Sequence, residues 1–168
     1  MEEKVVYFES GGKENTEATL QLAKEYAVEN NIKKVVVAST TGATAKAAYE
    51  LFKDTPIKLI SVGHGRGAYS SDVVSLLENK GYSVIFDDDI EAEYDSAIFR
   101  KFSRICIGAK VAVQCVQIAA NVDLLSEDEE VVSVAGTGRG ADTAIVILAA
   151  KSDSFGLREI QKILCRPR

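Results

Sequence analysis

The chain has 168 residues, of which 46% are hydrophobic and 27% charged, and its formal net charge is -5. That length suits one well-buried globular unit, so we expect a single domain over residues 1–168. The negative charge argues against a nucleic-acid partner. The longest apolar run, from Ala144 to Ala150, is too short to cross a membrane. The acidic N-terminus does not resemble a signal peptide, so we expect a cytoplasmic protein without a membrane partner.

Apolar runs and amphipathic stretches alternate through the first half of the chain. Short runs rich in β-branched residues predict strands, and apolar residues at helical spacing predict helices. In order, we expect an edge strand at Lys4–Glu9, a helix from Asn15 or Thr16 to about Asn30, a doubly buried strand at Val35–Ala38, a helix to about Phe52, and a strand at Ile57–Val62.

The second half continues the alternation until its last two strands. We expect a helix from Ser70 or Ser71 to Asn79, a strand at Tyr82–Phe86, helical structure over Glu91–Leu125, strands at Val131–Ala135 and Ile145–Ala149, and a closing helix at Leu157–Cys165. Such alternation predicts a mostly parallel sheet between two helical layers. Only Gly136–Thr143 separates the last two strands, which is too short for a crossover helix, so these strands should pair antiparallel.

The loop from Ser39 to Thr44 is the first candidate binding feature. It follows a predicted strand, contains several hydroxyl groups and Gly42, and leads into a helix. The first turn of a helix has unpaired N–H groups and a positive dipole end, which together favour an anion such as phosphate. An ordinary Ser or Thr helix cap is the alternative interpretation.

Two further glycine loops follow predicted strands, at Gly63–Gly67 and at Gly136–Asp142. In parallel sheets ligands bind outside the carboxyl ends of the strands, so the three loops should form one site. The Gly136–Asp142 loop, the third loop, matches G-x-G-x-x-G/A, but a strand follows it where a dinucleotide site needs a helix. It is therefore either a plain hairpin loop or a group of N–H donors for phosphate, and Arg139 either contacts the ligand or pairs with Asp142.

Metal binding is not expected. The cysteines Cys106, Cys115 and Cys165 are odd in number and far apart, which suits packing residues better than a disulfide framework or a zinc site. The acidic run Asp87–Asp89 could hold a divalent cation but is more typical of a solvated loop. His64, between two glycines, is a candidate ligand contact, and the sequence identifies no catalytic residue.

Two of these segments resemble a known domain. Ser39–Ala45 is similar to a hydroxyl-rich loop in the carboxyl-terminal α/β domain of pyruvate kinase, which in many pyruvate kinases holds a phosphate of the allosteric sugar bisphosphate. Val131–Leu148 resembles the last hairpin of that domain, whose glycine-rich loop closes over the same effector. With Val35–Ala38 as strand 1, the resemblance implies a five-stranded core sheet of order 3-2-1-4-5, with strand 5 antiparallel. The catalytic barrel is absent, so phosphotransfer is not implied.

A closer resemblance is to small, largely archaeal proteins that consist of this domain alone. They share segments similar to Glu14–Thr16, Lys110–Val113, Ala135–Ala144 and Ile163–Arg168, and they look like binders of flavin mononucleotide (FMN). The resemblance thus implies FMN as the cofactor, with its phosphate on the first loop. We expect its ring between the two glycine loops. The expected contacts are Asn15, Ser39, Thr40, Thr41, Gly42, Thr44, Gly63, His64, Gly65, Gly136, Thr137, Gly138, Arg139 and Gly140.

A different class of function is also compatible with the sequence. The chain could be a regulatory or oligomerisation domain without catalysis, which binds a sugar phosphate or no ligand. The apolar stretch Ile107–Leu125 could form either a core helix or the seam of a homo-oligomer. The expected partner is a phosphorylated small molecule in one case and a second copy of the chain in the other.

Overall fold

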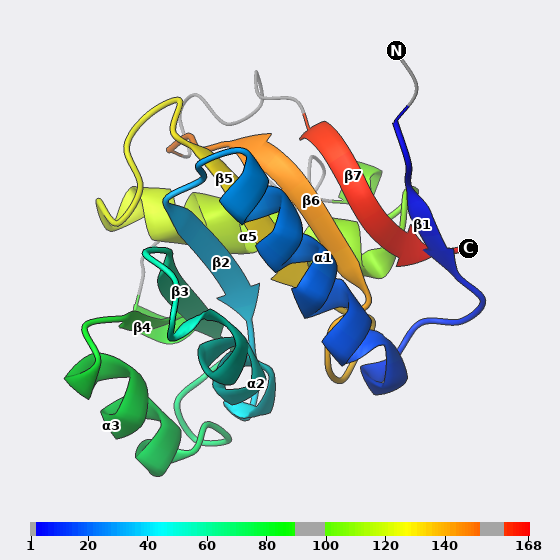
Figure 1. The fold of residues 1–168 in the computed structure, drawn as a ribbon. Coiled ribbons are helices and arrows are strands. Elements are labelled where there is room, and N and C mark those ends of the chain that lie inside the picture. The colour runs from blue at the N-terminus through cyan, green and yellow to red at the C-terminus, as the bar shows by residue number, and fades with distance from the viewer. Residues whose placement is uncertain (1–2, 90–99, 152–159) are drawn as a thin grey trace.

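The computed structural model describes residues 3–89, 100–151 and 160–168. A single mixed sheet lies between layers of helices (Figure 1). In chain order the elements are β1 (Val6–Phe8), the 3-10 turn η1 (Lys13–Asn15), α1 (Thr16–Glu29), β2 (Lys34–Ala38), α2 (Ala43–Phe52), β3 (Lys58–Gly63), α3 (Ser71–Asn79), β4 (Ser83–Phe86), the 3-10 turn η2 (Asp87–Asp89), α5 (Ile107–Asn121), β5 (Glu130–Ala135), β6 (Thr143–Leu148) and β7 (Ile160–Pro167).

The sheet confirms the predicted core order and extends it. Its seven strands run β1-β7-β6-β5-β2-β3-β4. The five strands from β6 to β4 have the order expected from the sequence, with β2 between β5 and β3. β5 and β6 pair antiparallel, as their short connection requires. β1 forms the expected edge, but the sheet is wider than predicted because β7 inserts between β1 and β6.

The predicted closing helix over Leu157–Cys165 is wrong where the structure describes it. Residues 160–167 form β7, which pairs antiparallel with β6 and parallel with β1; residues 157–159 lie outside the described ranges. The apolar residues of this short segment fit both a helical and a strand period, and pairing with the neighbouring strands makes it a strand. Leu164 and Cys165 are buried as a result, against the face that α1 covers.

The helical structure predicted over Glu91–Leu125 is confirmed only in part. α5 occupies only Ile107–Asn121, and Cys106 before it has extended backbone (φ -172°, ψ 166°). Residues 91–99 lie outside the described part of the chain. The Cys106 sulfur accepts a hydrogen bond from the N–H of Ala109 at 3.3 Å, so it satisfies a donor in the first turn of α5.

The two faces of the sheet carry separate cores. Val35 and Val37 of β2 face α1 and α2, whereas Val36 faces α5. This alternation follows from the two-residue period of a strand, and it explains why the run is apolar throughout. In Figure 1, α1 crosses the front of the sheet and α5 lies behind it. Within the described residues, no helix has the length and apolar character that crossing a membrane requires.

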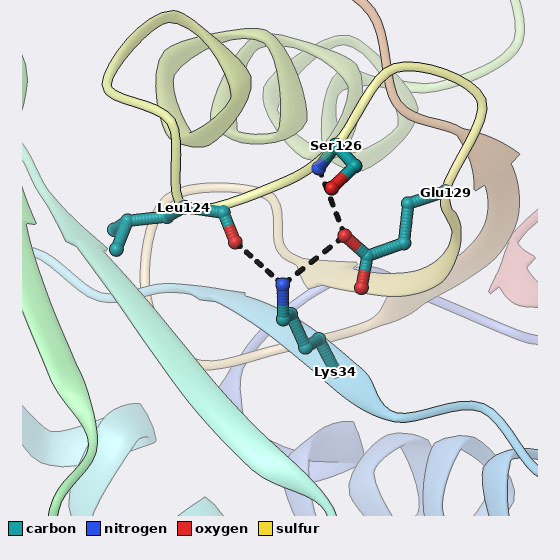
Figure 2. A network of polar contacts seen from close by, with 4 residues as sticks. All are labelled: Lys34, Leu124, Ser126 and Glu129. Carbon is teal, nitrogen blue, oxygen red and sulfur yellow. Dashed lines mark hydrogen bonds and ion pairs between the residues drawn. The ribbon is translucent and has the colours of Figure 1, made fainter.

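A small polar network fixes the amino-terminal end of β2, away from the carboxyl edge (Figure 2). The Lys34 ammonium donates to the Leu124 carbonyl at 2.8 Å and to the Glu129 carboxylate at 3.1 Å. The same carboxylate oxygen accepts the N–H of Ser126 at 2.9 Å. These contacts tie the loop between α5 and β5 to the start of β2.

Candidate functional site

A cleft of about 1020 Å³ lies at the carboxyl edge of the parallel strands. It brings together the three loops that the sequence placed there, and η1 and α5 complete its walls. The predicted residues that line it are Ser39, Thr40, Thr41, Thr44, Gly63, His64, Gly136, Gly138, Arg139 and Gly140. The other predicted residues, which do not line it, are Asn15, Gly42, Gly65 and Thr137.

The loop after β2 presents unpaired donors to the cleft. Within the described residues, we find no partner for the backbone N–H groups of Thr40, Thr41, Gly42 and Thr44. The Ser39 hydroxyl accepts the N–H of Ala45 at 3.3 Å and also hydrogen-bonds to the Tyr69 hydroxyl, and the Thr41 hydroxyl accepts the N–H of Ala43 at 3.5 Å. Side-chain capping therefore accounts for part of the first turn of α2 and leaves the rest open to an anion.

Gly42 shapes this loop. It is the N-cap of α2 and has φ 89°, a left-handed conformation that disfavours side chains. A Cβ there would also lie 3.0 Å from the Tyr69 ring and 3.2 Å from Val73. Gly42 thus allows the turn to pack against Tyr69 and Val73, and it does not line the cleft itself.

The segment between β3 and α3 packs against the Ser39–Thr44 loop and supports it. The N–H of Ser70 donates to the Thr41 carbonyl at 3.1 Å, and the Tyr69 hydroxyl pairs with Ser61 at 2.7 Å. Burial raises the pKa of Tyr69, so its hydroxyl stays protonated at neutral pH. Ser70 is the N-cap of α3, but neither its side chain nor that of Asn15 makes a capping hydrogen bond.

The Gly136–Asp142 loop is held by a buried carboxylate rather than by Arg139. Asp142 is fully buried and accepts the N–H groups of Gly12 and Thr137, both at 2.9 Å, and the Thr143 hydroxyl at 2.7 Å. The Arg139–Asp142 pair considered from the sequence does not form. Arg139 is exposed, lines the cleft, and has no polar partner within the described residues.

The start of α1 packs against this loop. The Thr16 hydroxyl donates to the Lys13 carbonyl at 2.7 Å and accepts the N–H of Ala141 at 3.0 Å. A Cβ on Gly140 would overlap both Thr16 and Lys13, so only glycine allows this approach. Lys13 thereby reaches the cleft, whereas the Asn15 amide donates to the Ser10 carbonyl at 2.8 Å.

His64 has a partner that the sequence did not suggest. Its Nδ1 hydrogen-bonds to Asp87, whose other oxygen accepts the N–H of Gly65 at 2.9 Å. The bond to Asp87 raises the pKa of His64. Burial acts to raise the pKa of Asp87, but the bonds from His64 and Gly65 outweigh it and lower that pKa. One signal was available: Asp87 directly follows one predicted strand, His64 follows another after Gly63, and those strands are neighbours in the predicted sheet.

Sequence reasoning also missed the wall that α5 contributes. Ile107, Val111 and Ile118 are its apolar part, and Lys110 and Gln114 its polar part. Cys115 lines the cleft too, but burial raises its pKa to about 12, so it is no thiolate nucleophile at neutral pH. We find no cluster of three or more His, Cys, Asp or Glu side chains suited to a metal in the part of the chain that the structure describes.

Comparison with known proteins identifies the family. The profile of the pyruvate kinase alpha/beta domain matches residues 17–147, which is most of the chain. The chain belongs to the pyruvate kinase alpha/beta domain family. The resemblance to that domain is confirmed, whereas the relation to small, largely archaeal proteins remains a prediction.

Solved pyruvate kinases from Cryptosporidium parvum show weaker overall likeness. One structure is 15% identical with TM-score 0.48, and it is matched over 80% of this chain and 23% of its own. A second is 14% identical with TM-score 0.46, over 80% and 22%. A third, in complex with ADP, is 16% identical with TM-score 0.44, over 80% and 23%. The chain therefore spans less than a quarter of the length of these enzymes.

The matched part of this pyruvate kinase alpha/beta domain contains most of the cleft. Residues 17–147 include all three loops and α5, but exclude Lys13, Thr16, β1 and β7. The wall formed by η1 and the start of α1 is therefore a feature of this chain beyond the family match. It is joined to the matched part through Asp142 and Ala141.

Proposed function

We propose that the cleft binds a phosphorylated small molecule, with the phosphate on the Ser39–Thr44 loop. The observation that carries the proposal is the set of unpaired N–H groups in that loop, at the N-terminus of α2. A phosphate can accept several hydrogen bonds at once, and the helix dipole favours its charge. The loop supplies no lysine of its own, so backbone donors and the Thr44 hydroxyl are the main contacts.

The rest of the cleft suits a ligand with a large, flat apolar body. Its volume of about 1020 Å³ exceeds the needs of a phosphate alone, and α5 offers Ile107, Val111 and Ile118 as an apolar wall. FMN fits this combination: the first loop would hold its phosphate, and α5 with the Gly136–Asp142 loop would hold its ring. A bound flavin supplies electron and hydride transfer. Lys13, Lys110 and Arg139 line the same cleft, and their positive charges suit the anionic ring of a reduced flavin.

A second candidate is a regulatory domain that binds a sugar phosphate without catalysis. Membership in a family named for one domain of a larger enzyme favours it. The cationic side chains Lys13, Lys110 and Arg139 would then meet a second phosphate or the sugar hydroxyls, in place of a ring. Both candidates use the first loop in the same way, and they differ in what lies against α5.

Calorimetric titration with FMN, riboflavin and fructose 1,6-bisphosphate separates these candidates. We expect FMN to bind, and riboflavin to bind much more weakly because it lacks the phosphate. Thr44→Val, which removes one hydroxyl, should weaken FMN binding by roughly tenfold or more, whereas Ser75→Ala, exposed on α3, should leave it unchanged. Binding of the sugar bisphosphate alone would favour the regulatory candidate. Failure of both phosphate esters to bind would refute the proposal.

A further inference from the structure

The carboxyl ends of β2, β3 and β4 lie level with one another at the cleft. The Ser39–Thr44 loop, called the phosphate loop below, follows β2. In the register of the sheet, Ala38 lies beside Val62, and Gly63 lies beside Phe86. The N–H of Ser39 continues this ladder with a bond of 2.9 Å to the Val62 carbonyl. The residues that come next on the three strands are therefore the phosphate loop, His64 and Asp87, in that spatial order.

Asp87 fixes which nitrogen of His64 remains available for a ligand. It occupies Nδ1, and the ring is 83% exposed while lining the cleft. We find no partner for Nε2 among the described residues. With Nδ1–H committed to Asp87, a neutral ring presents a lone pair at Nε2, and only the protonated ring presents a donor there. Nε2 can therefore hydrogen-bond to a phosphate oxygen only if one proton lies between them.

We propose that protonated His64, oriented by Asp87, donates a hydrogen bond from Nε2 to the bound phosphate, so that the cleft binds a phosphate monoester together with one proton. This inference rests on the proposed function and adds the ionisation state of its ligand. The site should prefer monoesters to diesters, because a diester is a weaker acceptor with a single charge. Asp87 acts here as a positioning residue.

The charges around His64 come from several elements. Asp87 and Asp88 follow β4, and both favour the protonated ring. Arg66, on the same loop as His64, stacks over the Phe86 ring at 4.6 Å. Lys13, Lys110 and Arg139 line the cleft from η1, α5 and the third loop and oppose protonation, and Cys115 is uncharged at neutral pH. The hydrogen bond to Asp87 and the charge of Asp87 outweigh burial, which acts to lower the pKa of His64, so this pKa is raised.

The test compares dissociation constants of FMN and of inorganic phosphate between about pH 6 and 9. We expect His64→Gln to weaken binding by about tenfold at the acidic end and to approach the wild-type affinity at the alkaline end. The ionisation of the phosphate, near pH 6, affects both proteins equally and cancels from the ratio. In the wild type, affinity should fall as the pH rises and His64 loses its proton. Asp87→Asn should shift this fall to lower pH, whereas Asp72→Asn, exposed on α3, should not.

Each outcome decides a separate point. A His64→Gln ratio that is the same at every pH, or that equals one throughout, would overturn this inference while leaving the proposed function in place. A wild-type protein that binds neither probe, and does not bind fructose 1,6-bisphosphate either, would overturn both. His64 is the only histidine in the chain, so one imidazole signal in a proton NMR titration gives its pKa directly. That pKa should rise when inorganic phosphate is added.

Discussion

His64 and Asp87 make the smallest unit of the site, and their ionisation links it to pH. The pKa of His64 lies above its ordinary value of 6.5, and that of Asp87 below 3.8. The contribution of His64 to stability is complete below pH 6.5 and is lost as the pH rises through the raised pKa. The contribution of Asp87 is present above pH 3.8 and is lost as the pH falls through the lowered pKa. The pair thus stabilises the fold between these limits.

The matching prediction concerns Asp87→Asn without any ligand. The loss in free energy of unfolding relative to wild type should be largest in mildly acidic solution and should shrink as the pH rises past the histidine titration. The His64 imidazole signal should also titrate at lower pH in this variant. Urea unfolding at several pH values measures the first effect, and NMR the second. A difference in stability that grows towards alkaline pH would contradict the assignment.

Individual side chains were the hardest part of the site to predict. The loop residues could be found because hydroxyls and glycines after a strand signal their own local geometry. The contacts of Lys13, Lys110 and Asp87 depend on how distant segments pack, and a single sequence does not encode that as a local pattern. Asn15 stays a prediction from the resemblance: its NH₂ group donates to the Ser10 carbonyl, and it does not line the cleft.

At the scale of elements, Asp142 holds four parts of the fold together. It joins the turn before η1, the third loop and the first residue of β6. The start of α5 also approaches it, because a Cβ on Gly108 would lie 3.0 Å from its carboxylate. Asp142 is therefore a buried anchor for the side of the cleft formed by η1 and the Gly136–Asp142 loop.

Replacing this anchor should destabilise the protein more than any nearby surface change. In Asp142→Asn, a neutral amide oxygen would replace the charged acceptor of the Gly12 and Thr137 N–H groups, and the NH₂ would face the Thr143 hydroxyl, which now donates to the carboxylate. We expect a loss of about 2–3 kcal/mol in the free energy of unfolding, measured by urea denaturation. Asp72→Asn, an exposed acid of α3, serves as the control and should change it by less than about 0.5 kcal/mol. Equal stability of the two variants would show that the three bonds contribute little.

Elements with strong local patterns were predicted well, and those set by pairing were not. β2 and α2 follow from a β-branched run and an alanine-rich stretch, and both appear close to the expected bounds. β7 was predicted as a helix because Ile160, Ile163 and Leu164 also fit a helical stripe. Its strand conformation comes from the open edges of β6 and β1, which only the assembled sheet provides.

At the scale of the whole molecule, the carboxyl-terminal strand completes the sheet. β1 pairs only with β7, within the part of the chain that the structure describes, and β7 separates it from β6. Without β7 the edge of β6 would be long, apolar and unpaired, which invites aggregation. The free energy of the fold thus depends on residues that the family match leaves out.

Removal of residues 160–168 tests this dependence. We expect the truncated chain to be insoluble or to lose its cooperative urea transition, whereas removal of Arg168 alone should leave the transition nearly unchanged. Circular dichroism during urea titration provides the measurement. A truncated protein that unfolds at the wild-type midpoint would mean that the core strands β6 to β4 are sufficient.

The parallel pairing of β1 with β7 also determines how the molecule responds to a mechanical load. Three residue pairs join the strands, from Val6 beside Cys165 to Phe8 beside Pro167. A pull on the two chain ends draws β1 backwards and β7 forwards along their common axis. All the hydrogen bonds between them are then strained together in shear, whereas an antiparallel pair loaded at one end would open one bond at a time. The short β1 strand therefore acts as a clasp that resists tension between the ends of the chain.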